Sequence, residues 1–472
     1  MSRPTHDSET RLTVQEVDLN DATWNEVVAT KLPSNLEEQA HLHKAWSRKR
    51  GINSVSNLLR ALLVYACCQY SFRERGMWAV LKGIGSLSER AWRKRLEQSR
   101  DWIAWLLTDL LGVHQRPVWL PEGVGRVRLV DATRWKTQGG TGDDVRLHQS
   151  DDLATGKMDQ VQLTTRYQAE SLSHFALAEG DLMVTDAGYP VPSSVEVTQQ
   201  SKSFLLQRTT ASHLHIEDED GQTIVLKEQI KGQRSDSLKQ LKGWIRMPKS
   251  GERTQVRLLC YRLPEEQAKK ARDRKAAKLR KKHGRTYNQE VVWWASWILF
   301  VTTTDEAIWS GQDLVYLYRA RWQIELLFKR IKQCLHLHRL VLKDWGRVSC
   351  VLHLNLIAWW LQEQEAQFLR DLLTEVLLPT QGPISHVWES EECNEEPEEF
   401  QRVFSSRTVA HFCCEEVRTM LRGAWTRQRK LECAPILLRY VLSRKRKRGH
   451  RESEQRAWLE AKYCQMAGPS VA

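Results

Sequence analysis

Hydrophobic residues in the first part of the chain recur at the three- and four-residue spacing that is typical of amphipathic helices. Residues 55–68 and 101–112 are the clearest segments of this kind. Two prolines, Pro117 and Pro121, mark a boundary shortly after the second segment. We therefore expect a helical N-terminal region over residues 1–115.

Within this region the order of elements is a helix, a glycine break at Gly83 and Gly85, and a second helix from about Ser86. The second helix has an apolar side with Trp92 and a strongly basic face. This order is compatible with a helix-turn-helix that binds DNA, and also with an ordinary helical hairpin whose basic face is solvated. The basic residues are Arg90, Arg93, Lys94 and Arg95.

After the two prolines the pattern changes to short apolar runs that are typical of buried strands. Residues 126–131 form one such run and residues 182–186 another, and each ends on an aspartate, Asp131 or Asp186, that enters a turn. Residues 191–304 then alternate strand-like segments with basic ones. We interpret this part of the chain as an α/β domain that is interrupted by a β-rich insertion.

One stretch beyond the insertion, residues 318–332, combines helical spacing with an unusual polar face. At about 100° per residue, Tyr318, Arg321, Glu325 and Lys332 fall within roughly 60° of one another, beside an apolar stripe. The ordinary interpretation is a surface helix with an Arg–Glu pair four residues apart. A functional interpretation requires other acidic residues to join Glu325, since a lone carboxylate is a poor metal site.

The net charge of the chain indicates which kind of molecule it binds. The 472-residue chain has a formal net charge of +13 and a pI near 9.3, which suits a polyanion, nucleic acid first. Basic runs at residues 269–285 and 444–448 either follow a phosphate backbone or are simply solvated. The ten cysteines show no paired zinc-ligand spacing, and the N-terminus has no signal-peptide core. No apolar run reaches the length of a membrane span, so we expect a soluble cytoplasmic protein.

Asp131, Asp186 and Glu325 form a pattern that suits a metal site, with two aspartates at strand ends and a glutamate on a later helix. Carboxylate oxygens suit Mg²⁺, and two such ions about 4 Å apart activate an attacking oxygen and stabilise a leaving one. The pattern alone does not single out these three, because other aspartates lie in the same region, most of them in polar loops. These are Asp143, Asp144, Asp151, Asp152, Asp159 and Asp181.

The chain resembles the DDE transposases of bacterial insertion sequences, in the cut-and-paste branch of the IS-four type with the signature Y-x2-R-x3-E-x6-K. Tyr318, Arg321, Glu325 and Lys332 match that signature at every spacing. In addition, Asp131-Ala132-Thr133 resembles the first acidic motif of the family, and Asp186-Ala187-Gly188-Tyr189 resembles the second. The resemblance extends from about residue 35 to residue 380.

The resemblance implies an RNase H-like core with a mixed five-stranded sheet and flanking helices. Together with the hydrophobic pattern, it implies five regions along the chain. These are a helical DNA-binding region at residues 1–115, the first part of the catalytic core at 116–190, the β-rich insertion at 191–304, the last part of the core at 305–380, and an acidic linker with a basic helical C-terminal region at 381–472.

The family also implies roles for individual residues. Asp131, Asp186 and Glu325 would hold two Mg²⁺ ions, for which Mn²⁺ can substitute, and DNA strands would be cut and transferred at inverted-repeat ends. Tyr318, Arg321 and Lys332 would contact DNA phosphates. Relatives cut the second strand through a DNA hairpin, which requires a base flipped out of the stack. Trp297 is the candidate to stack on that base, and a buried strand tryptophan is the alternative.

The expected partners are double-stranded DNA, both element ends and target, and a second protomer in a synaptic complex. We expect no membrane partner and a location in the bacterial cytoplasm, at the nucleoid. Two other functions remain open on the sequence. One is a DNA-binding regulator derived from a transposase, and the other is an RNase H-like nuclease that acts on other nucleic acids.

Overall fold

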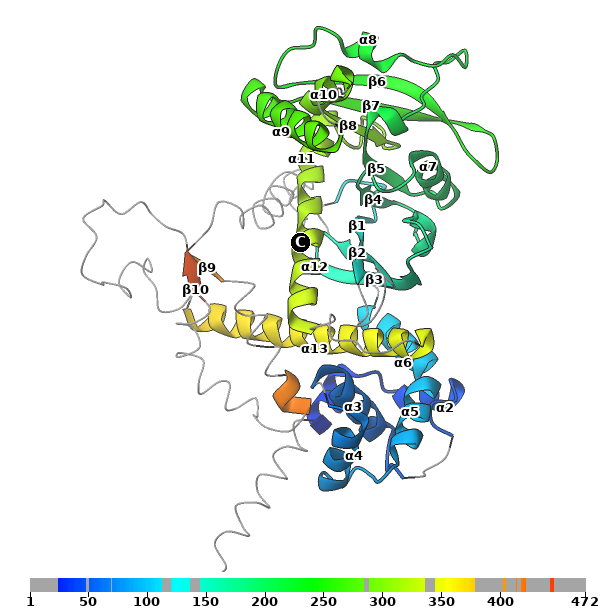
Figure 1. Cartoon of the computed structure of the whole chain (residues 1–472), viewed down its shortest axis with the longest axis vertical. Helices are drawn as coiled ribbons and strands as arrows, with labels where there is room; N and C mark the ends of the chain where they lie inside the picture. Colours follow the sequence, from blue (N-terminus) through cyan, green and yellow to red (C-terminus); the bar gives the residue numbers. More distant parts are fainter. Residues whose placement is uncertain are drawn as a thin grey trace, which may run out of the picture. The chain divides into compact units, whose positions relative to one another are not determined.

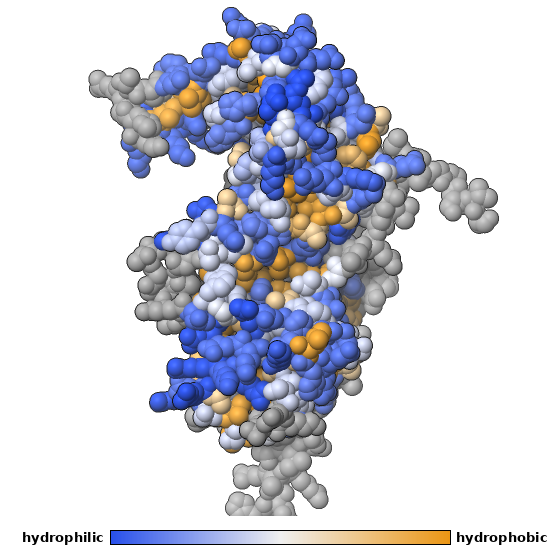
Figure 2. Space-filling view, turned by 90° about the vertical axis from the view of Figure 1, so that its right-hand side faces the viewer, coloured by the Kyte–Doolittle hydropathy of each residue, from blue (hydrophilic) through white to orange (hydrophobic). Residues whose placement is uncertain are grey.

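A computed structural model describes residues 24–47, 51–68, 70–112, 120–135, 145–283, 288–335, 344–377, 402–404, 413, 417–421 and 442–444. The chain divides into two compact units, which we describe separately (Figure 1). The helical unit contains residues 1–112, 135–142 and 328–449, and the sheet unit contains residues 113–134, 143–327 and 450–472. Hydrophilic residues cover most of the face drawn in Figure 2.

Serine caps set the starts of several helices in the helical unit. The Ser54 hydroxyl accepts a hydrogen bond at the start of α3 (Val55–Cys67), and Ser88 does the same for α5 (Glu89–Gln98). Ser71 and Glu74 form a reciprocal capping box at the start of α4 (Phe72–Leu81). Such caps satisfy amides that have no partner within the helix. The other elements are α2 (Leu36–Leu42), α6 (Arg100–Leu111), α13 (Trp345–Leu377), β9 (Arg402–Phe404) and β10 (Leu442–Arg444).

The long helix α13 organises the packing of this unit, because it runs against both α6 and α3 (Figure 1). Its residues Val351, Leu354 and Ile357 are buried, as are Leu58 and Leu62 of α3. Within the described residues, no helix combines the length and the hydropathy that crossing a membrane requires. The apolar side chains of α13 pack against α6 and α3.

Arg75 of α4 is fully buried, and its guanidinium lies among aromatic rings. It lies 4.1 Å from the ring centroid of Trp92 and 4.8 Å from those of Tyr65 and Phe72. Its three side-chain nitrogens have no hydrogen-bond partner among the residues described. Burial lowers the pKa of Arg75 to about 9. Cation–π attraction therefore joins α3, α4 and α5 at this point.

The sheet unit is built on a mixed eight-stranded sheet in the order β3-β2-β1-β4-β5-β8-β7-β6 (Figure 1). β1, β4 and β5 are parallel to one another, whereas the pairs β2/β3, β5/β8, β8/β7 and β7/β6 are antiparallel. The strands are β1 (Arg126–Trp135), β2 (Val145–Asp152), β3 (Lys157–Thr165), β4 (Asp181–Thr185), β5 (Phe204–Thr209), β6 (Ser237–Arg246), β7 (Arg253–Arg262) and β8 (Trp297–Thr302).

The sheet has a hydrophobic core on each face. Leu129 and Val184 belong to one core cluster, while their neighbours Val130 and Met183 belong to the other, as the alternation of side chains along a strand requires. α7 (Val191–Gln200) contributes Val195 to the second cluster, and α11 (Gly311–Tyr318) contributes to the first. Strands β1 and β4 are therefore covered on both sides, which explains why residues 127–130 of β1 and all of β4 are buried.

The strands of residues 191–304 extend the sheet instead of forming a separate one. The first five strands have the order 3-2-1-4-5, and β8, β7 and β6 continue from the edge of β5. The sheet thus has eight strands where the resemblance implied five, because β8 pairs directly with β5. The same segment contains the helices α8 (Leu226–Ile230), α9 (Glu265–His283) and α10 (Gln289–Trp293). This mixed α/β architecture is consistent with an RNase H-like core.

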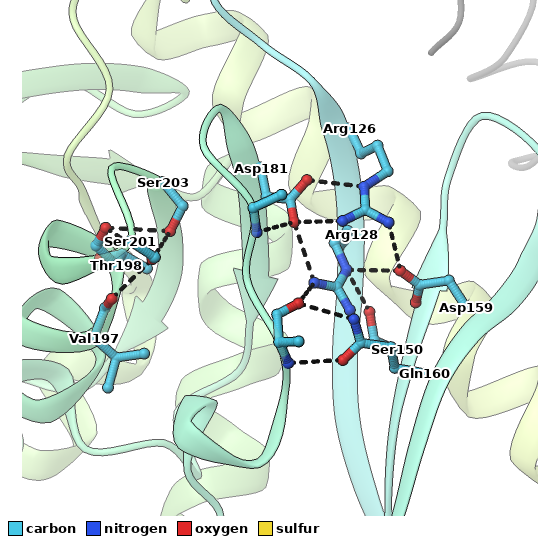
Figure 3. Close-up of polar contacts among 12 residues, drawn as sticks. Arg126, Arg128, Ser150, Asp159, Gln160, Asp181, Val197, Thr198, Ser201 and Ser203 are labelled. Carbon is cyan, nitrogen blue, oxygen red and sulfur yellow. Dashed lines mark hydrogen bonds and ion pairs between the residues drawn. The ribbon is translucent and has the colours of Figure 1, made fainter. Parts of the chain in front are cut away.

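A buried ion-pair network fixes the beginning of the central strands (Figure 3). Asp181 of β4 pairs with Arg126 at 2.7 Å and with Arg128 at 3.2 Å, and Arg128 also pairs with Asp159 of β3 at 2.8 Å. The Arg128 guanidinium further donates to Ser150 of β2 at 2.9 Å. Each of the four charged side chains pairs with two others, since Arg126 also contacts Asp159 at 3.4 Å, so the network ties the register of β1 to that of β4 and of the β2/β3 hairpin.

Candidate active site

Asp131 on β1 and Asp186, directly after β4, lie at corresponding positions along two neighbouring parallel strands. Leu129 of β1 is the register partner of Val184 of β4, and each aspartate comes two residues later. Asp186 follows the last residue of β4, as the sequence predicted, and its Oδ1 accepts a hydrogen bond of 2.8 Å from the amide of Gly188. β1, however, continues to Trp135, so the prediction that Asp131 ends its strand was wrong.

The signature stretch is not one uninterrupted helix, as its periodicity predicted. α11 ends at Tyr318, a 3-10 turn spans Arg319–Arg321, and α12 (Trp322–Leu335) begins directly after it. Arg321 Nη1 contacts Asp131 Oδ2 at 3.0 Å, and Arg321 Nη2 contacts Glu325 Oε1 at 2.6 Å. The guanidinium therefore links the first aspartate to the glutamate, although these acids are far apart in the sequence.

The environment of Asp131 disfavours its charge. Burial, together with the carboxylates of Asp186 and Glu170, raises the pKa of Asp131 to about 6, although the Arg321 guanidinium and the Ala132 amide act to lower it. The Ala132 amide donates to Asp131 Oδ1 at 2.7 Å. A cation beside Asp131 would thus relieve an unfavourable charge that the protein alone only partly compensates.

Tyr318 lies in the core beneath this site. Its ring meets Phe300 edge-on at 4.8 Å between centroids, and the Arg321 guanidinium lies 5.8 Å from its ring centroid. Burial raises the pKa of Tyr318 to about 12. Tyr318 therefore helps to place Arg321, while its predicted contact with DNA remains a prediction.

The other two predicted site residues lie apart from this group of contacts. Lys332 belongs to the helical unit, where its Nζ lies 5.9 Å from the ring centroid of Trp135. Trp297 is only 6% exposed, and its ring packs against Trp293 at 5.4 Å, with the Arg262 guanidinium at 5.3 Å. Trp297 thus has the packing of a buried strand residue, and base stacking by it stays a prediction.

Sequence reasoning missed Glu170, which lies between β3 and the 3-10 turn at Leu172–His174. The Glu170 carboxylate adds to the effect of burial in raising the pKa values of Asp131 and Tyr189. Burial and then the charge of Asp186 raise the pKa of Glu170 itself. These four side chains are therefore close in space. No spacing in the sequence links Glu170 to the acidic motifs, because its segment is a short polar connection without periodicity.

The donor set suits a hard divalent cation in its chemistry, since every candidate ligand is a carboxylate oxygen. Among the residues described, no three acids, histidines or cysteines are already arranged around one point as metal ligands. The positions of Asp131 and Glu325 explain this, because both carboxylates face the Arg321 guanidinium. Holding a metal ion at these acids therefore requires the guanidinium to move away from them.

Comparisons with known proteins identify the family of the chain. The family model described as "Transposase DDE domain" matches residues 122–361, about half of the chain, and this range contains Asp131, Asp186 and Glu325.

The chain is also similar to the proteins of several insertion sequences. InsL of insertion sequence element IS186A from Escherichia coli (strain K12) is 29% identical over 343 residues, which are 72% of this chain and 92% of that protein. The transposase for element IS421 from Escherichia coli is 29% identical over 344 residues, with the same shares. The transposase for element IS231B from Bacillus thuringiensis subsp. berliner is 23% identical over 212 residues, 42% of this chain and 44% of that protein.

Proposed function

The chain belongs to the DDE transposase family, enzymes that act on DNA, and we propose that it cuts DNA at the inverted-repeat ends of an insertion sequence and joins them to target DNA. The observation that carries this proposal is the level placement of Asp131 and Asp186 on adjacent parallel strands, with Glu325 joined to Asp131 through one guanidinium. Water first attacks a phosphodiester, and the freed 3′ hydroxyl then attacks the target strand.

We assign Asp131, Asp186 and Glu325 to hold Mg²⁺, with two ions per site and Mn²⁺ as a substitute. Bound there, the metal supplies charge neutralisation and a more acidic water. The protein supplies the rest: parallel pairing holds the two aspartates level, and the hydrogen bonds to Asp131 and Asp186 from the Ala132 and Gly188 amides fix their carboxylates. Because Asp131 is destabilised as an anion, it has a strong electrostatic reason to accept a cation.

Arg321 has a second role in this proposal. A guanidinium binds a phosphate through two parallel hydrogen bonds as well as it binds carboxylates. A DNA phosphate that enters the site competes with Asp131 and Glu325 for Arg321, and so frees both carboxylates. The arrival of the substrate thus strengthens cation binding at these acids, which a cation also reaches, more weakly, by displacing Arg321 in the DNA-free protein.

The remaining signature residues would position DNA. We propose that Lys332 contacts a phosphate of the DNA backbone, and that the hydroxyl group of Tyr318 contacts another. Hairpin formation at the element end would place a flipped base on Trp297, for which Trp293 or Arg262 must leave its ring. In the helical unit, α5 exposes Arg90, and we propose that its basic face binds DNA.

The test is incubation of the purified protein with labelled DNA from the ends of its own element and Mg²⁺, resolving nicks, hairpins and joined products. We expect Glu325→Gln to bind ends normally and to leave them uncut. Glu179→Gln is the matched control, since that side chain is 75% exposed and pairs only loosely with Lys202. Nicking that persists in Glu325→Gln would refute the assignment of the triad.

The same gel separates the alternatives. Binding without any nicking by the wild-type protein would favour a transposase-derived regulator, and nicking without strand-transfer products would favour an RNase H-like nuclease. Joining of both ends to target by a complex of two protomers, seen as a shift in native electrophoresis, is the outcome we expect.

A further inference from the structure

The carboxylate of Glu170 leans over the turn that holds Asp186. A Cβ atom placed on Gly188 would lie 2.2 Å from Glu170 Oε2 and 3.0 Å from Asp186 Oδ1. The φ angle of Gly188 is not in the left-handed region, so the backbone does not require glycine here. A side chain at position 188 would instead displace the end of the Glu170 side chain, because the two carboxylates occupy the space that it would fill.

Glu170 has little compensation for its charge. The Arg146 guanidinium lies 4.0 Å from the Glu170 carboxylate, and its Nη1 atom donates to the Gln168 carbonyl at 2.7 Å. Arg146 and Arg134 both lower the pKa of Glu170, but neither outweighs its burial. The Glu170 side chain is only 20% exposed, and burial, followed by the charge of Asp186, raises its pKa against the effect of Arg146. Two carboxylates therefore share a partly buried space beside Gly188.

An independent feature of the same space is the hydroxyl of Tyr189. Tyr189 is 2% exposed, and its phenol oxygen has no hydrogen-bond partner within the described part of the chain. Burial raises the pKa of Tyr189 well above its ordinary value, and Asp131, Glu170 and Asp186 each raise it further. A buried hydroxyl without a partner near these carboxylates indicates a missing ligand, such as a hydrated cation whose water donates to the phenol oxygen.

We propose that Glu170 is a fourth carboxylate of the cation site, and that it holds the divalent cation beside Asp186 either directly or through one of the waters of the cation. This proposal rests on the proposed function, because it assumes a cation at Asp131 and Asp186. It goes beyond the three-acid pattern of the sequence, and it explains together why Gly188 has no side chain and why the Tyr189 phenol has no partner.

The experiment measures Mn²⁺ binding to the DNA-free protein, from the electron paramagnetic resonance signal of free Mn²⁺, so that cleavage is not needed as a readout. We expect Glu170→Gln to weaken Mn²⁺ binding about 10- to 100-fold, as the loss of a supporting ligand does in other metal sites. Asp186→Asn is the positive control and Glu179→Gln the negative one. Circular dichroism melts check that each variant is folded.

A second variant, Gly188→Ala, displaces the Glu170 carboxylate while keeping that residue in the chain. Gly188→Ala places a methyl group where Glu170 lies, so it should weaken Mn²⁺ binding in the wild-type background. In a Glu170→Ala background, where the space is free, Gly188→Ala should add little further loss. Equal losses in the two backgrounds would mean that the methyl group acts on Asp186 alone, and would overturn the proposal.

The outcomes of this titration also separate this inference from the proposed function. Unchanged Mn²⁺ binding in Glu170→Gln, with lost binding in Asp186→Asn, would overturn the role of Glu170 and leave the three-acid site intact. Unchanged binding in both variants, or no saturable binding by the wild-type protein, would overturn the cation site itself and Glu170 with it.

Discussion

Replacing Asp131 by Asn should abolish DNA cleavage and at the same time stabilise the sheet unit. The side chain is 14% exposed, and its pKa is about 6 against an ordinary value of 3.8. A carboxyl whose pKa is higher in the folded chain than in the unfolded chain favours folding when it is protonated. That contribution is fully present below pH 3.8 and is lost as the pH rises through about 6.

The size of the effect follows from the shift. One pKa unit corresponds to about 1.4 kcal/mol, so the ionised Asp131 lowers the free energy of unfolding by about 3 kcal/mol at pH 7.5 relative to its protonated form. Asparagine resembles the protonated form, because it is neutral and keeps an oxygen that accepts from the Ala132 amide. Asparagine is not attracted to Arg321 as the ionised aspartate is. The pKa shift of Asp131 already includes this attraction, because Arg321 lowers that pKa.

The assay is thermal unfolding of wild-type and Asp131→Asn protein without metal, at pH 7.5 and at pH 4.5. About 2–4 °C per kcal/mol applies to domains of 150–250 residues, so the variant should melt several degrees higher at pH 7.5. The difference should shrink at pH 4.5, where the wild-type carboxyl is protonated. Adding Mn²⁺ should stabilise the wild-type protein and leave the variant unchanged.

Two results would refute this reasoning. A variant that melts at or below the wild-type temperature at pH 7.5 would show that Arg321 fully compensates the burial of Asp131. A stability difference that does not change with pH would show that ionisation of Asp131 is not its cause.

Three further predictions concern other buried charges. Asp181→Asn should lower the free energy of unfolding by about 3 kcal/mol, because it removes one of the two carboxylates that Arg126 and Arg128 share and leaves Asp159 alone beside two guanidinium groups. Urea unfolding measures this, and a loss below 1 kcal/mol would contradict it. Arg75→Met should keep or raise the stability of the helical unit, whereas Arg75→Ala should lower it, because alanine leaves a cavity among the aromatic rings. Thermal melts measure both variants. Equal losses of stability in the two would show that the cation–π contacts of Arg75 stabilise this unit. Arg321→Gln should strengthen Mn²⁺ binding by the DNA-free protein while reducing end cleavage, and weaker Mn²⁺ binding would exclude competition at the acids.

Much of the fold was accessible from local patterns. The apolar runs at residues 126–131 and 182–186 predicted β1 and β4, and the helical periodicity of residues 55–68 predicted α3; the structure confirms all three. Family membership, which the spacing of Tyr318, Arg321, Glu325 and Lys332 indicated, is confirmed by the match over residues 122–361. Such features are local, since strand and helix periods need only a few neighbouring residues.

Local patterns failed where long-range contacts override them. Helical periodicity across residues 318–332 predicted one helix, but a 3-10 turn at Arg319–Arg321 separates α11 from α12. β1 continues past Asp131 to Trp135, although the sequence indicated a turn. The strands of the insertion join the edge of β5, and nothing within residues 237–302 specifies that partner.

The sequence by itself determined which residues are candidates for the chemistry: Asp131, Asp186 and Glu325, with Arg321 and Lys332 at the basic positions of the signature. Only the tertiary structure decided how they meet. It places the two aspartates level through the pairing of β1 with β4, inserts Arg321 between Asp131 and Glu325, and brings Glu170 over Gly188. The physical reason is distance along the chain, because Asp131 and Arg321 are 190 residues apart. Contacts of that kind depend on the packing of the whole sheet unit, which no local periodicity encodes.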